Sequence, residues 1–104
     1  MTMKIDMTTQ ILDLDGEPIP QSKDGPITTL RSVVEGALLA PMRGDENLAG
    51  AKKAELFLLV MRVHTEDECE MKAEEIVTIK DRVGKLYGPL VVGRAYAILD
   101  PDGK

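Results

Sequence analysis

The stretch that decides the fold is residues 28–41, TTLRSVVEGALLAP. Its large apolar side chains recur at the three- and four-residue spacing of one helix face. Thr28 or Thr29 can cap the first amide groups, and Pro41 ends the helix because proline disfavours helical geometry in the residue before it. We therefore expect a helix over about residues 29–40. The face that it buries comprises Leu30, Val33, Val34, Ala37 and Leu38.

Three further segments have the composition of helices. Residues 48–63 carry only four charged side chains, and the second half of this segment is apolar almost all round. A strand over 56–60 is the alternative, but the nearby alanines and the length of the segment favour a helix, which we expect to be the central, buried one. A third helix should begin near Ala73, and a break at Gly88 should separate it from a last helix over 89–99.

The N-terminal segment, residues 1–26, is rich in prolines, glycines and turn-forming acids, which excludes a long helix. Apolar side chains alternate with polar ones near its start, at Met3, Ile5 and Met7. This pattern predicts an extended arm or a short β-hairpin. Because a two-stranded unit is marginal alone, the arm needs the helical body or another subunit to lie against. We expect deletion of residues 1–20 to weaken association but to leave the helices folded.

The predicted fold class is mainly α, with an extended or β-hairpin arm over 1–26 and a compact bundle of about four helices over 27–104. A chain of 104 residues has material for one domain and one hydrophobic core. Helical spacing predicts that this core contains Val34, Leu38, Phe57, Met61, Ile79, Val83 and Ile98.

Composition excludes several classes of partner. Eighteen acidic residues against 13 basic ones give a net charge of −5, the wrong sign for a surface that binds phosphate, so we expect no direct contact with nucleic acid. The longest apolar run, residues 56–61, is far shorter than the roughly 20 residues that cross a membrane. The single cysteine, Cys69, predicts a reducing compartment. The N-terminal residues lack an apolar run, so we expect no signal peptide.

Residues with catalytic or metal-binding chemistry are few. His64 and Cys69 are five residues apart, but a structural zinc site needs four ligands, and an acidic loop would have to supply the others. Asp13 and Asp15 precede Gly16 as in a calcium loop, yet the later ligands of such a loop are missing. We therefore expect no enzyme activity, no metal and no cofactor, and interpret His64 as a helix-end residue.

Residues 66–75 hold six acids and one lysine, so this segment carries as much negative charge as the whole chain does in net. A solvated helix start explains Glu74 and Glu75, because the helix dipole favours carboxylates there. The other interpretation is an electrostatic docking surface for a basic partner. The candidate partner-binding residues are Glu66, Asp67, Glu68, Glu70, Glu74 and Glu75 in this segment, and Met3, Ile5 and Met7 in the arm.

Three stretches carry a resemblance to a known group. They are Ile27-Thr-Thr-Leu-Arg, the Leu38-Leu-Ala turn, and residues 79–96, IKDRVGKLYGPLVVGRAY. Together with the order of the segments, they make residues 27–99 similar to small proteins encoded by tailed bacteriophages and prophages. The resemblance implies a setting, a virion or the cytoplasm of a bacterial host, and assigns no residue a role.

Two functions are compatible with these patterns. The first is a non-enzymatic virion structural or assembly component, such as a head, neck or tail accessory protein, whose partners are copies of itself or other phage proteins. The second is a small acidic inhibitor or adaptor that binds the basic surface of a host nucleic-acid enzyme. Salt separates them, since high ionic strength releases an electrostatic complex and barely changes a hydrophobic contact.

Overall fold

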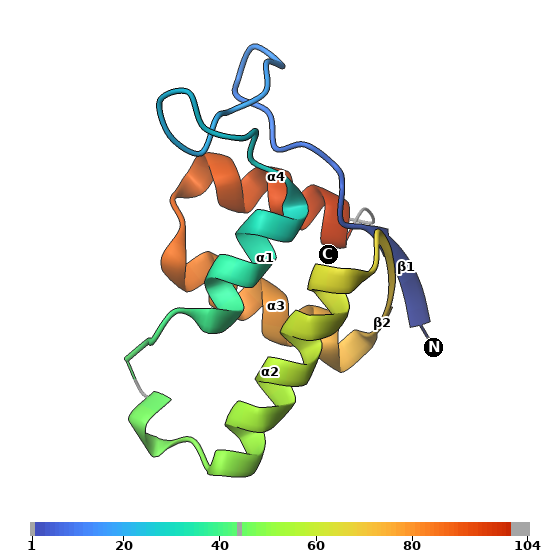
Figure 1. Cartoon of the computed structure of the whole chain (residues 1–104), viewed down its shortest axis with the longest axis vertical. Helices are drawn as coiled ribbons and strands as arrows, with labels where there is room; N and C mark the ends of the chain where they lie inside the picture. Colours follow the sequence, from blue (N-terminus) through green and yellow to red (C-terminus); the bar gives the residue numbers. More distant parts are fainter. Residues whose placement is uncertain (1, 44, 101–104) are drawn as a thin grey trace.

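The structure is a computed structural model that describes residues 2–43 and 45–100. Over these residues the chain is mainly α, with four α-helices, one 3₁₀ turn and a two-stranded antiparallel sheet (Figure 1). In chain order the elements are β1 (Thr2–Asp6), α1 (Leu30–Leu39), the 3₁₀ turn η1 (Asp45–Asn47), α2 (Gly50–Thr65), β2 (Glu68–Lys72), α3 (Ala73–Leu86) and α4 (Pro89–Leu99).

Helix α1 begins and ends as the sequence predicts. The Thr29 hydroxyl accepts a hydrogen bond from the Ser32 amide, and the Ser32 hydroxyl accepts one from the Thr29 amide, which closes a capping box. The helix ends at Leu39, just before the residue that precedes Pro41. All five residues of its predicted apolar face are buried, so the helix is confirmed together with its orientation.

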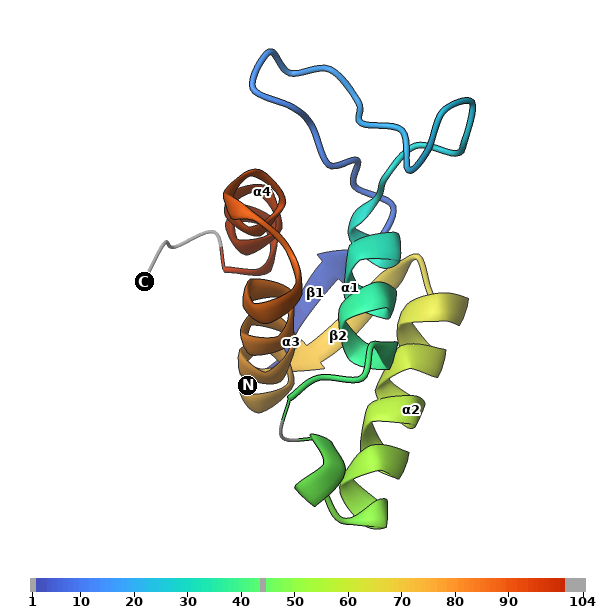
Figure 2. The same cartoon turned by 90° about the vertical axis from the view of Figure 1, so that its left-hand side faces the viewer.

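Helix α1, and not α2, lies at the centre of the helical layer. It packs against both α2 and α3, and α4 packs against α3 (Figure 2). Figure 2 shows α2 at the edge of the molecule, with no helix or strand on its outer side. The expectation that residues 48–63 form the central buried helix is therefore wrong. Helix α2 itself is confirmed, but only one of its sides packs against α1.

The N-terminal strand is built into the body. Strand β1 pairs antiparallel with β2, with Met3 opposite Met71 and Ile5 opposite Cys69. The side chains of Ile5 and Cys69 are buried, and Met7 just after the strand is completely so. The partner strand lies in the acidic segment, where Cys69 and Met71 alternate with charged residues. We expected the helices to stay folded without residues 1–20, but this segment supplies buried side chains to the core, which contradicts that expectation.

Between β1 and α1 the chain makes a long loop that projects from the body (Figure 2). A bridge between Leu12 and Pro18 gives its first part a hairpin-like form, with Gly16 in the left-handed region at φ 83°. The expected extended arm therefore has a local turn at this point. Arg94 of α4 donates hydrogen bonds to the carbonyl oxygens of Leu12 and Asp13, which ties this part of the loop to α4.

Two arginines satisfy carbonyl groups at the C-terminal ends of helices. Arg82 of α3 donates to the Ala37 and Ala40 carbonyls at the end of α1, 2.9 Å away in each case, and also contacts the Asp45 carboxylate. Arg31 of α1 donates to the Val63 carbonyl at the end of α2. Because a helix leaves its last four carbonyls without partners inside the helix, these side chains tie neighbouring helices together.

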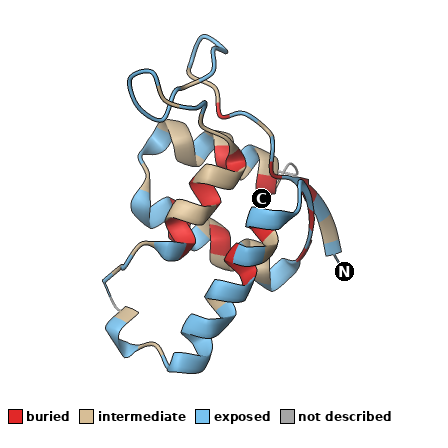
Figure 3. Ribbon diagram, viewed as in Figure 1, coloured by how far each residue is buried: buried red, intermediate tan, exposed pale blue. Residues whose placement is uncertain are grey.

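Figure 3 shows that the buried residues gather where α1, α3 and the sheet meet. The predicted core residues Val34, Leu38, Ile79 and Val83 are buried there, and Ile98 packs against them while partly exposed. Two members of the predicted set were assigned wrongly. Phe57 is 55% exposed and Met61 is 42% exposed, because helical spacing sets both apart from the buried side of α2.

Candidate functional site

Helix α2 has two apolar faces that point in different directions. With 3.6 residues per turn, Leu59, Val60 and Val63 fall on one side, and all three are buried. Phe57, Leu58 and Met61 fall on the other side, and each is exposed. We call these three residues, together with Leu39, the α2 outer face.

Leu39 extends this face across to the end of α1. It is 62% exposed, and it lines a hollow of about 280 Å³ together with Phe57 and Lys53. Four large apolar side chains from two helices thus meet at one surface. Monomeric proteins rarely expose a contiguous apolar patch of this kind unless something binds there.

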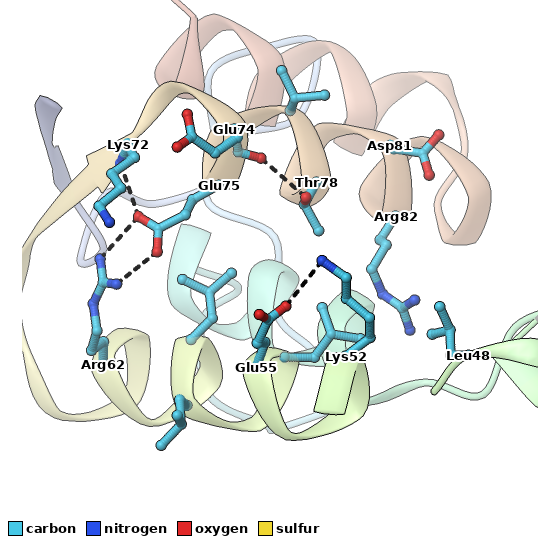
Figure 4. A pocket seen from close by; sticks show the side chains of 14 residues that line it. Leu48, Lys52, Glu55, Arg62, Lys72, Glu74, Glu75, Thr78, Asp81 and Arg82 are labelled. Carbon is cyan, nitrogen blue, oxygen red and sulfur yellow. Dashed lines mark hydrogen bonds and ion pairs between the residues drawn. The ribbon is translucent and has the colours of Figure 1, made fainter. Parts of the chain in front are cut away.

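Beside the α2 outer face, and sharing Leu58 with it, lies a groove between α2 and α3 (Figure 4). The groove has a volume of about 820 Å³, and its apolar part includes the exposed side chains of Leu58 and Val77. Its lining carries charges of both signs in equal number, namely Lys52, Arg62, Lys72 and Arg82 against Glu55, Glu74, Glu75 and Asp81. The groove therefore has no excess charge with which to attract a small ion.

Most of the charged side chains in the groove form ion pairs or hydrogen bonds within the chain. Arg62 lies 2.8 Å from Glu75 and also donates to the Glu70 carbonyl, and Lys52 lies 3.3 Å from Glu55 (Figure 4). Burial opposes ionisation of Glu75, but hydrogen bonds from Arg62 and from the Lys72 amide outweigh it and hold the pKa of the carboxyl below its usual value. The same hydrogen bond to Glu75 raises the pKa of Arg62. This pair connects α2 to α3 and is structural.

The six acidic candidates do not share one role. Glu75 is paired with Arg62, and Asp67 lies 2.7 Å from Arg31. The side chain of Glu70 accepts a hydrogen bond from Thr2 across the sheet. Glu75 is partly buried and the other five are exposed, including Glu66, Glu68 and Glu74.

The apolar candidate residues of the arm pack within the chain itself. Ile5 and Met7 are buried in the core, and Met3 is partly buried against it. Their alternation does predict a strand, as the structure has it. The interpretation of Ile5 and Met7 as side chains that meet a partner is corrected, because β2 and the helices already cover them.

His64 and Cys69 are not brought into a common site. His64 Nδ1 lies 2.9 Å from a carboxylate oxygen of Glu35 at the surface, whereas Cys69 is buried in the sheet. Burial raises the pKa of the Cys69 thiol, which disfavours the reactive thiolate. Within residues 2–43 and 45–100, no three side chains of the His, Cys, Asp and Glu types are grouped so as to hold a metal ion. No helix in that part of the chain is long and apolar enough to span a bilayer.

The α2 outer face is a candidate interaction surface that the sequence patterns did not reveal. The available signal was the apolar character of residues 56–61 on all sides, which we interpreted as full burial. A 16-residue helix at the edge of a small body has neighbours on one side only, so the second apolar face remains at the surface.

The comparisons with known proteins give no residue a role. The chain matches no protein-family model, no curated protein and no solved structure. The function proposed below accordingly rests on the geometry of the α2 outer face.

Proposed function

We propose that this protein acts by binding other proteins and not by catalysis, as a structural or assembly component of a phage particle. The observation that carries the proposal is the α2 outer face, where Leu39, Phe57, Leu58 and Met61 are exposed together. An apolar centre with charged residues around it is the usual composition of a protein interface. Lys53 and His64 border this face on one side, and Glu55 and Arg62 border it on the other.

The phage setting is supported by the resemblance of residues 27–99 to small proteins of tailed phages. The loop between β1 and α1 supports an assembly role, since it projects from the body (Figure 2) and carries Leu14, which is 87% exposed in the turn closed by the Leu12–Pro18 bridge. A rigid body with a projecting loop can contact two neighbours at once, as components of a particle do.

The test is incorporation into particles made by the bacterial strain that carries the gene. Particles purified from an induced culture are examined for the chain by mass spectrometry, with wild type compared with a Phe57→Ser, Met61→Ser double variant. We expect the wild-type chain to be detected in the particles and the double variant to be absent from them. The matched control is Leu86→Ser, an exposed apolar residue of α3 that lines neither the groove nor the hollow. Particles that lack the wild-type chain contradict the proposal.

The alternative function, an acidic inhibitor or adaptor for a basic enzyme surface, is favoured by one observation. Glu66, Glu68 and Glu74 are exposed near one another in sequence, and Asp6 lies opposite Glu68, so two carboxylates face each other at this end of the sheet. Binding through these residues should weaken steeply between low and high salt, and Glu68→Lys should weaken it further. Binding through the α2 outer face should change little in the same salt series.

A further inference from the structure

The α2 outer face is complementary to itself. We propose that a second copy of this chain covers it, with the two α2 helices antiparallel about a two-fold axis at the level of Leu59 and Val60. The inference rests on the proposed function, because it names the first partner of the same surface. Most soluble oligomers close in this way, with one patch used twice.

The apolar residues along the midline of the face fit this arrangement. Ala54, Leu58, Met61 and Thr65 recur at the four- and three-residue spacing of a helix–helix seam, and all are exposed. In an antiparallel pair, residues at equal distances from the centre lie opposite each other. Leu58 then contacts Met61 of the second copy, and Ala54 contacts Thr65. The small residues at the outer layers let the helix ends approach closely.

The charged borders of the face fit it as well. Glu55 and Arg62 lie on one border, nearly equidistant from the centre, so Glu55 lies beside Arg62 of the second copy. On the other border, Lys53 lies beside His64 of the second copy, and the Glu35 carboxylate is 2.9 Å from that histidine ring. Glu55 thus lies near an arginine that its own Glu75 also contacts, and Lys53 lies near the Glu35 carboxylate that accompanies His64. Antiparallel pairing also places the two helix dipoles head to tail.

The same borders disfavour a membrane surface as the occupant. A helix that lies on a membrane needs a strongly basic polar side, whereas the borders of α2 carry both signs and the chain has a net charge of −5. The length of contact is adequate for a pair, because a helix of 16 residues is about 24 Å long. Leu39 and the hollow that it shares with Phe57 widen the contact on one side.

The first test is the mass of the purified chain by sedimentation equilibrium over a range of concentrations. We expect wild type to reach twice the 11.4 kDa of one chain. Met61→Lys should raise the dissociation constant at least about 100-fold, since it places a charge in the seam, and leave helical content and melting of the monomer unchanged. The matched control, Leu14→Lys, changes an apolar residue that is far from the seam and should dimerise as wild type does.

The second test fixes the direction of the helices. Chains with Ala54→Cys and chains with Thr65→Cys are mixed and oxidised gently; the native Cys69 is buried and does not compete. Antiparallel helices give a disulfide between the two different chains, whereas parallel helices join each variant to itself. A wild-type chain that remains a monomer at several hundred micromolar would overturn the inference. So would a Met61→Lys variant that dimerises as strongly as wild type.

The two proposals fail in different ways. If wild type is a monomer in solution, yet enters particles and loses that ability with the Phe57→Ser, Met61→Ser variant, the occupant is another particle protein, so this inference is wrong and the proposed function stands. If wild type dimerises through α2 but is absent from particles, the dimer stands and the proposed function is wrong.

Discussion

At the scale of the residue, Arg82 does most to connect separate parts of the chain. Its guanidinium contacts the carbonyl groups at the end of α1 and the Asp45 carboxylate at the start of η1. The hydrogen bond from Arg82, with a further one from the Met42 amide, holds the pKa of Asp45 below its ordinary value of 3.8. Asp45 in turn fixes the arginine against α1.

This lowered pKa predicts how stability depends on pH. Below pH 3.8 the unfolded chain takes up a proton at Asp45 before the folded chain does, so the contribution of the carboxylate is complete above that value and is lost as pH falls through the lowered folded pKa. Asp45→Asn should therefore reduce the stability near neutral pH and flatten its fall in acid. The measurement is the urea midpoint from about pH 5 to pH 2. If the urea midpoint of Asp45→Asn falls in acid as that of wild type does, Asp45 does not stabilise the folded chain in this way.

Two apolar residues should respond in opposite ways to truncation. Ile5→Ala should lower the free energy of unfolding by about 2–5 kcal/mol, because Ile5 is buried between the sheet and the helices. Phe57→Ala should cost the monomer about 1 kcal/mol or less, because over half of the ring surface is already exposed to water. Urea unfolding of both variants at a concentration where wild type is monomeric checks the contrast. A larger loss for Phe57→Ala would place the ring in the core.

At the scale of the element, the pairing of β1 with β2 joins the N-terminal segment to the helical body. The two strands are brought together from opposite ends of the α1–α2 unit, and the pairing buries Ile5 and Cys69. Met7 continues this burial, and its carbonyl accepts a hydrogen bond from the Arg31 amide at the start of α1. The N-terminal strand is therefore a structural part of the body.

Removal of β1 should destabilise the helices. Deletion of residues 1–7 removes two buried side chains and leaves the Cys69 and Met71 side chains of β2 without cover. We expect a large loss of melting temperature, or a chain that does not fold cooperatively, in thermal unfolding followed by circular dichroism. Lys4→Ala is the control, since its side chain is exposed on the outer side of β1. Unchanged melting of the truncated chain would show that β1 is dispensable.

Periodicity predicted the four helices because each has at least one apolar face at helical spacing. It did not identify β2, because the pattern of residues 68–72 has only two apolar side chains and its partner strand is more than 60 residues away. It also assigned α2 to the centre, because spacing alone cannot tell which of two apolar faces is covered. The turn at Gly16 was predictable, as its chemistry is local.

At the scale of the whole molecule, the two candidate surfaces differ in character. The outer side of the sheet and the segment that leads into it carry more acids than lysines, whereas the α2 outer face is apolar with charges of both signs at its borders. Association through α2 should therefore survive high salt. The dissociation constant measured at low ionic strength and in 1 M NaCl should differ by less than about tenfold. Loss of the dimer in high salt would indicate that the two copies contact each other through the charged surface instead.

The central claim is that the α2 outer face is where this protein meets a partner, first of all a second copy. The most direct measurement is NMR of methyl-labelled methionines across a dilution series, because the six methionines include Met61 on this face and Met7 and Met71 in the core. We predict that the Met61 methyl signal shifts with concentration while the signals of Met7 and Met71 stay in place. A Met61 signal that does not change while the chain associates would contradict the account.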